Sequence, residues 1–169
     1  VAWNGSLWVV VGSGTNTIAT SSDGINWTSR GASTFTTAGY GVAWNGSLWV
    51  AVGTGTHTIA TSNDGITWTG RGTNFFQGTG TSTGLGIAWN GLRWVAVGKS
   101  ATTTTNSIMY STDGITWTNA TPTNIFTNAA STSGGVSWNG NRWVAVGNGT
   151  NSIAHSTDGI TWSDLDHIA

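Results

Sequence analysis

The sequence predicts an all-β fold, a β-propeller of four-stranded antiparallel blades with four repeats in this chain. Three observations predict it. One twelve-residue phrase recurs four times, it recurs at intervals of 41, 45 and 49 residues, and no stretch shows the apolar spacing of a helix. A period of this length is typical of propeller blades, whereas leucine-rich repeats are about 20–29 residues long. We therefore expect one repeat domain over residues 1–169.

The recurring phrase sets the boundaries of the expected blades. It reads VAWNGSLWVAVG at Val42–Gly53, and close copies begin at Val1, Ile87 and Val136. Dividing the chain before each copy gives four units. They cover residues 1–41, 42–86, 87–135 and 136–169.

Each phrase predicts the first two strands of a blade. Asn4-Gly5 is a strong signal for a two-residue hairpin turn, because a type I′ turn needs positive φ at both central positions. Such a turn would place Trp3 opposite Ser6 and Val1 opposite Trp8. One face of the ribbon would then hold Val1, Trp3, Trp8 and Val10, and the other Ala2, Leu7, Val9 and Val11. Both faces are apolar, so we expect each ribbon to be covered by a neighbouring blade on both sides.

The second half of each unit predicts the two outer strands. In the first unit we expect a third strand around Thr17–Ser21 and a fourth at Ile25–Thr28, on either side of the Asp23-Gly24 turn. The same text occurs four times in register. It reads IATSSDGINW at 18–27, IATSNDGITW at 59–68, IMYSTDGITW at 108–117 and IAHSTDGITW at 153–162.

These segments resemble the Asp-box hairpins of BNR-type propellers, a group that includes sialidases and many secreted repeat proteins. The resemblance implies that a Ser and an Asp side chain hydrogen-bond the turn backbone and that an aromatic residue covers it. In the first unit these roles fall on Ser21, Asp23, Gly24 and Trp27. The chain departs from the family pattern because one residue is missing between Asp and Trp. The corresponding turn residues of the later units are Ser62, Asp64, Ser111, Asp113, Ser156 and Asp158.

Composition argues against several classes of partner and site. The net charge is −1 and only 7% of residues are charged, against about 25% in an average domain. No basic field therefore attracts nucleic acid, and no segment approaches the about 20 apolar residues of a membrane span. The chain has no cysteine, so it offers neither a disulfide nor a thiolate metal site.

The acidic residues do not predict catalysis. The chain contains no glutamate, and four of its six aspartates share one turn position, which we interpret as a turn lock. Only Asp164 and Asp166 remain. Glycosidases use two carboxylates placed across the scissile bond, and the sialidases that the chain resembles also use an arginine triad and a tyrosine nucleophile. We therefore expect no enzymatic activity.

The histidines do not predict a metal site or a cofactor. His57, His155 and His167 lack the spacing of known zinc motifs. The terminal stretch at 164–167 is interpreted as a solvated tail. Two arginines, Arg93 and Arg142, stand before a tryptophan where the first two units have leucine, and we expect their aliphatic stems to lie on aromatic faces.

Loop variation indicates where a ligand would bind. The loops between second and third strands and the linkers between units carry all the length variation, and binding residues commonly lie on such loops. Three phenylalanines recur at similar points of the linkers, Phe35, Phe75 and Phe126, which leaves Phe76 as the expected exposed aromatic. An aromatic ring among Asn, Thr and Gly suits a sugar. The candidate binding residues are Arg30, Tyr40, Arg71, Phe76 and Lys99.

These observations predict a non-enzymatic binding module for a glycan or a protein, lectin-like or adhesive in character. The alternative is a structural or assembly propeller of a surface appendage, fibre or virion with no small ligand. A hydrolase is a third hypothesis, which the missing glutamate disfavours. The first two imply an extracellular, surface or virion location.

Ring closure is left open by the sequence. The four blades could close by themselves, belong to a larger ring, or associate with further chains. The first residue is not Met, which suggests a processed product or part of a longer polypeptide.

Overall fold

The computed structural model describes residues 1–73, 75–76, 82–99, 107–123, 125–126, 134–148 and 151–164. Over these ranges the chain forms sixteen strands in four antiparallel four-stranded sheets, and each sheet keeps the order of the chain. The predicted all-β fold with propeller-type blades is confirmed. Within the same ranges no helix is long and apolar enough to cross a membrane.

Each sheet repeats the same four strands, of which the last has only two residues. The first sheet contains β1 (Ala2–Trp3), β2 (Trp8–Val11), β3 (Ile18–Ser21) and β4 (Thr28–Ser29). The second contains β5 (Ala38–Trp44), β6 (Trp49–Thr54), β7 (Ile59–Ser62) and β8 (Thr69–Gly70). The third contains β9 (Thr83–Trp89), β10 (Trp94–Lys99), β11 (Ile108–Ser111) and β12 (Thr118–Asn119). The fourth contains β13 (Gly135–Trp138), β14 (Trp143–Val146), β15 (Ile153–Ser156) and β16 (Ser163–Asp164).

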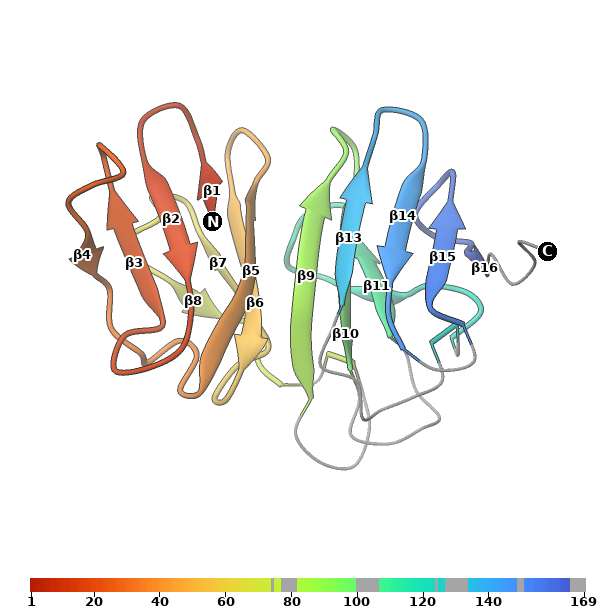
Figure 1. Ribbon diagram of the computed structural model, residues 1–169, viewed down its shortest axis with the longest axis horizontal. Coiled ribbons are helices and arrows are strands. Elements are labelled where there is room, and N and C mark those ends of the chain that lie inside the picture. The colour runs from red at the N-terminus through yellow and green to blue at the C-terminus, as the bar shows by residue number, and fades with distance from the viewer. Residues whose placement is uncertain are drawn as a thin grey trace.

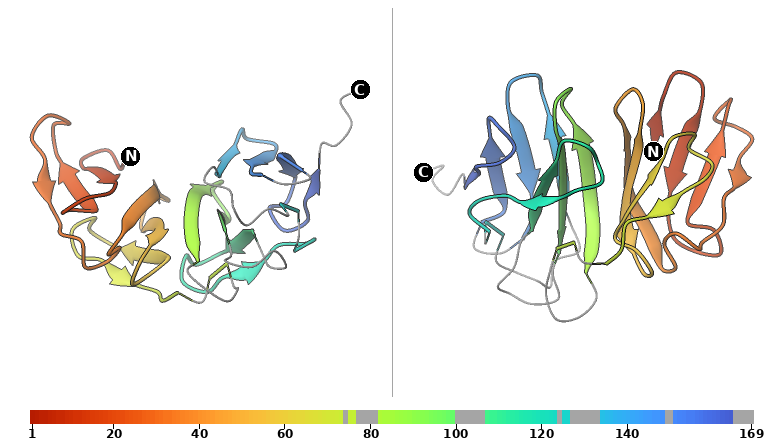
Figure 2. Two further views of the ribbon diagram at one scale, coloured as in Figure 1. Left: turned by 60° about the horizontal axis from the view of Figure 1, so that its bottom comes forward. Right: turned by 180° about the vertical axis from the view of Figure 1, so that it is seen from behind.

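The sheets stand side by side in chain order (Figure 1), and the left view of Figure 2 shows that they form an open arc. Strand β5 lies against β1 on one side and β9 on the other, and β13 also lies against β9. The first strands of the sheets therefore line the inner side of the arc. Figure 2 shows the first and fourth sheets standing apart at its two ends. Closure of four blades by themselves is not the arrangement that this structure shows.

The core consists of three apolar layers, each between two consecutive sheets. We call the face of a sheet that packs on the next sheet its forward face, and the opposite face its rear face. In the first layer, Val9 and Ile18 of the first forward face pack on Trp49, Ala51 and Ala60 of the second rear face. A ribbon with two apolar faces is thus covered on both sides in the interior of the arc, as its sequence predicts.

The other two layers repeat this arrangement. Between the second and third sheets the buried residues are Val50, Val52, Ile59, Phe76, Trp94, Ala96 and Met109. Between the third and fourth sheets they are Val95, Val97, Ile108, Ala120, Ile125, Trp143, Ala145, Ala154 and Trp162.

The register predicted for the first hairpin was wrong by two residues. Trp3 lies opposite Trp8, not opposite Ser6. The Asn4 side chain accepts hydrogen bonds from the backbone N–H groups of Ser6 and Leu7 at 2.9 and 2.7 Å, which holds a four-residue loop in place of a two-residue turn. The Trp3 and Trp8 rings then pack with their centroids 4.9 Å apart. Because the shift is an even number of residues, the predicted division into two faces still holds.

The fourth strand was also misplaced by the sequence. It covers Thr28–Ser29, whereas the prediction was Ile25–Thr28. The Asp23 carboxylate accepts hydrogen bonds from the N–H groups of Ile25 and Asn26, both at 2.8 Å, and so keeps these residues in the turn.

Phe76 is buried, which contradicts its prediction as the exposed aromatic. Its ring lies over Gly98, where an added Cβ would approach to 2.8 Å. Phe35 covers Gly53 and Phe126 covers Gly147 in the same way. Phe76, and not its neighbour Phe75, is therefore the recurring residue of the linker. Adjacent phenylalanines cannot be told apart by spacing, and in the structure it is Phe76, with a positive φ of 58°, whose ring turns inward.

Candidate functional site

The turn between the third and fourth strands of each sheet is built by one Ser and one Asp. In the second sheet the Ser62 hydroxyl donates to the Asp64 carboxylate at 2.9 Å and accepts from the N–H of Gly65 at 2.8 Å. The same carboxylate accepts from the N–H groups of Ile66 and Thr67 at 2.8 and 2.7 Å. The equivalent bonds occur in the other three sheets.

A tryptophan covers three of these turns. The indole N–H of Trp68 donates to the carbonyl of Gly65 at 3.0 Å. Trp27 and Trp117 make the same bond at 3.2 and 3.1 Å. Together with the Ser and Asp bonds, this fixes the backbone of each turn.

Hydrogen bonds to the turn carboxylates lower their pKa values. The backbone N–H of Thr67, followed by that of Ile66, lowers the pKa of Asp64 to about 2. Partial burial of Asp113 raises its pKa, but the N–H bonds from Thr116 and Ile115 outweigh it and lower the pKa to about 2. The pKa of Asp158 is also lowered, although burial again opposes the shift. Backbone and side-chain bonds from Asn26 hold the pKa of Asp23 far below its ordinary value. These carboxylates stay ionised as acceptors, which is unsuited to general acid catalysis.

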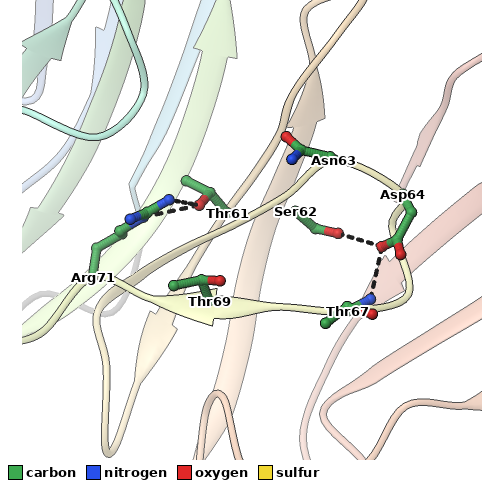
Figure 3. Close-up of a pocket in the computed structure, with 7 residues that line it drawn as sticks. All are labelled: Thr61, Ser62, Asn63, Asp64, Thr67, Thr69 and Arg71. Carbon is green, nitrogen blue, oxygen red and sulfur yellow. Dashed lines mark hydrogen bonds between the residues drawn. The ribbon is translucent and has the colours of Figure 1, made fainter.

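A pocket of about 190 Å³ lies on the outer strand pair of the second sheet, beside this turn (Figure 3). Every side chain that lines it is polar. The lining residues are Thr61, Ser62, Asn63, Asp64, Thr67, Thr69 and Arg71.

Arg71 is the only cation among the lining residues, and Thr61 fixes its side chain. Its Nε and Nη2 atoms donate to the Thr61 hydroxyl oxygen at 2.9 and 2.6 Å, and Thr61 itself is buried. The N–H of Arg71 donates to the carbonyl of Ile59 at 2.8 Å, which fixes the backbone as well. Arg30 makes the equivalent bond to Thr20 at 2.9 Å in the first sheet.

His57 supports the chain just after Arg71. Its Nδ1 atom accepts a hydrogen bond from the N–H of Gly72 at 3.1 Å. Its ring lies against Gly70, where an added Cβ would overlap it. His57 therefore packs against the end of β8, directly before Arg71.

The other candidate residues do not meet at this pocket. Tyr40 is half exposed at a bulge in β5, between Gly39 and Gly41. Lys99 ends β10, where it pairs with Thr83. The sequence thus identified Arg71 as a binding residue, assigned Asp64 to the turn alone, and missed the threonines. Thr61 and Thr69 are cross-strand partners, and only the pairing of β7 with β8 reveals that they share a face with Arg71.

Some of the loops that the sequence singled out lie outside the described residues. They include positions 100–106 and 127–133 and most of 74–81, together with the tail from 165 onward, which holds Asp166 and His167. In the part of the chain that the structure describes, no cluster of three or more His, Cys, Asp or Glu side chains could hold a metal ion.

Comparison with known proteins gives no assignment. No protein-family model matches the chain, and no curated protein matches it.

Proposed function

We propose that this chain is a non-enzymatic binding module of the propeller type that takes a carbohydrate unit in the pocket at Arg71. The observation that carries the proposal is that every side chain lining that pocket carries a polar group. Hydroxyl, amide, carboxylate and guanidinium groups supply both donors and acceptors, which a sugar with several hydroxyl groups requires. The aromatic stacking that the sequence suggested is not part of this proposal, because no aromatic side chain lines the pocket.

The size and rigidity of the pocket support a small ligand. Pockets for drug-sized molecules are about 300–1,000 Å³, so a volume of about 190 Å³ suits one sugar residue at the end of a chain. Thr61 holds the guanidinium of Arg71 in one orientation before a ligand arrives, which reduces the entropy that binding would cost. A carboxylate on an acidic sugar would bind this guanidinium best.

The turn aspartates support a binding role without catalysis. Each Asp is committed to backbone N–H groups of its own turn, and the sequence has no glutamate. We also infer that the four turns are Asp-box repeats of the BNR type, in which these residues have structural roles. This proposal implies an extracellular or surface-exposed location of the protein.

The experiment is a glycan array probed with the full chain, followed by titration of the strongest ligand against two variants. Arg71→Ala should weaken binding at least tenfold. Arg30→Ala is the matched control because Arg30 makes the same contact to a threonine in the first sheet, and we expect it to bind normally. An array without signal, or equal affinity of Arg71→Ala and the unmodified chain, would rule the proposal out.

A second candidate function is assembly, as a structural propeller of a surface appendage, fibre or virion. One observation favours it. Val144, Val146 and Ile153 on the forward face of the fourth sheet are exposed, although their counterparts in the other sheets are covered. Exposed apolar faces of this kind commonly mark contacts with another protein.

A further inference from the structure

The forward face of the fourth sheet is apolar and uncovered by any described residue. Val144, Val146 and Ile153 are 39, 43 and 37% exposed. Their equivalents in the third sheet, Val95, Val97 and Ile108, are 0–2% exposed because the fourth sheet packs on them. The second sheet shows the same burial at Val50, Val52 and Ile59. The fourth sheet therefore presents the surface that is buried at each internal junction.

The rear face of the first sheet lacks a neighbour in the same way. Gly24 is exposed, whereas its equivalents Gly65, Gly114 and Gly159 are buried. Ile25 in the same turn is 80% exposed, against 45% for Ile66 in the second sheet. The preceding sheet accounts for the difference, since a Cβ on Gly65 would meet Leu7 and Val9, and one on Gly24 would meet only Trp8 of its own sheet.

The two uncovered faces correspond to the forward and rear faces that pack on one another three times within the chain. A forward face offers two valines and an isoleucine, and the fourth sheet has all three. A rear face offers a tryptophan, one residue each of the second and third strands, and the turn glycine. The first sheet has Trp8, Val10, Ala19 and Gly24, with valine at the second-strand position where the other three sheets have alanine. The faces lie at opposite ends of the arc (Figure 2), so one chain does not bring them together.

We propose that the fourth sheet of one copy packs, head to tail, on the first sheet of a second copy, in the geometry of the internal junctions. This inference rests on the assembly role and is independent of the pocket. Copies joined in this way extend the arc. They form a closed ring if the rotation from sheet to sheet brings the fourth sheet of the last copy onto the first sheet of the first copy.

The junction between the third and fourth sheets shows which polar contact would form between copies. The Arg93 guanidinium donates to the main-chain carbonyl of Asp158 in the next sheet. Arg142 is the equivalent of Arg93, and the equivalent of Asp158 in the first sheet is Asp23. In the assembled pair, Arg142 of one copy therefore donates to the Asp23 carbonyl of the other.

One glycine of the first sheet differs from its equivalents in the other sheets. Phe35, Phe76 and Phe126 each cover a glycine of the following sheet, whereas a Cβ on Gly12, the equivalent glycine of the first sheet, would have nothing within 4 Å. Within one chain, no described phenylalanine therefore covers Gly12. We expect association that depends on concentration.

The first experiment is sedimentation equilibrium over a concentration series. The unmodified chain should rise above its monomer mass of 17.4 kDa. Val146→Glu on the fourth sheet and Val10→Glu on the first should each remain monomeric. Leu92→Glu is the control because Leu92 is 81% exposed at a hairpin loop away from both faces, and it should associate normally. Near-ultraviolet circular dichroism of the tryptophans verifies that each variant is folded.

The second experiment mixes the two monomeric variants. Val146→Glu keeps an intact first sheet and Val10→Glu keeps an intact fourth sheet, so the mixture should form a one-to-one complex. A monomeric unmodified chain at every concentration would overturn the inference. Association that survives Val10→Glu but not Val146→Glu would also overturn it, because the fourth sheet would then pack on its own copy, and the assembly role alone would stand.

Discussion

Arg93 binds the main-chain carbonyl of Asp158 through its guanidinium, across the junction between the third and fourth sheets. The same guanidinium lies 5.4 Å from the ring centroid of Tyr110 in its own sheet. Leu7 and Leu48 occupy the same place at the earlier junctions, where they pack on Gly65 and Gly114. At this equivalent position, either an apolar side chain or a cationic side chain thus makes the contact with the next sheet.

Arg93→Ala should lower the free energy of unfolding by about 1–3 kcal/mol, since it removes a charged hydrogen bond and a cation–π contact. Arg142→Ala is the matched control, because Arg142 is exposed and no sheet of the described residues packs beyond it. In dilute solution it should change stability by less than about 0.5 kcal/mol. Urea denaturation monitored by tryptophan fluorescence measures both. Equal losses in the two variants would show that the contact across the junction contributes nothing.

Gly53→Ala should destabilise the chain by about 1–3 kcal/mol through overpacking. A Cβ at this position would lie 2.4 Å from the Ala38 carbonyl and 2.7 Å from the Phe35 ring. Gly12→Ala at the equivalent place in the first sheet meets nothing within 4 Å and should be close to neutral. Thermal melting of the pair compares them directly, and a Gly53→Ala variant as stable as Gly12→Ala would contradict the packing of Phe35 over this strand.

Ser111→Ala should cost about 1–3 kcal/mol, because it leaves the N–H of Gly114 buried without its acceptor. Ser47→Ala is a suitable comparison, since the exposed Ser47 hydroxyl bonds only to Asn45 within a hairpin loop. We expect that variant to lose less than about 0.5 kcal/mol. Chemical denaturation tests the difference, and the buried hydroxyl would have no special role if both variants unfolded alike.

Stability should fall as the pH is lowered from about 4 toward 2. The folded pKa of Asp64 and Asp113 is about 2, below the ordinary value of 3.8, so the ionised carboxylate favours the folded state. The stabilisation is complete above the unfolded pKa and is lost as the pH falls through the folded pKa. Urea midpoints over a pH series measure it.

Asp113→Asn tests the origin of that pH dependence. Asparagine keeps an acceptor oxygen for the turn but does not titrate. The slope of the free energy of unfolding against pH, between pH 4 and 2, should therefore become shallower by the contribution of about one of the four turn carboxylates. An unchanged slope would assign the pH dependence to groups outside the turns.

Local signals allowed much of this fold to be predicted. The repeat of one phrase gave the four sheets, and the alternation of apolar residues gave both faces of each ribbon. The strand register of the first hairpin was not predicted correctly from these signals. The Asn4 side chain holds a longer loop in place of a two-residue turn, and the Trp3 ring packs on Trp8. Of the residues that line the polar pocket, the sequence predicted only Arg71 as a binding residue and gave Ser62 and Asp64 a structural role in the turn. Thr61 and Thr69 were not predicted, since they meet through strand pairing.

The sequence by itself determined that this chain folds as repeated antiparallel sheets, because a ribbon apolar on both sides is stable only between neighbours. It also determined the turns, where a Ser and an Asp bond to backbone groups two or three residues away. Only the tertiary structure decided that Phe76 turns inward and that the arc stays open at Val144 and Gly24. These outcomes depend on how one sheet packs on the next, and such contacts join residues that no local pattern relates.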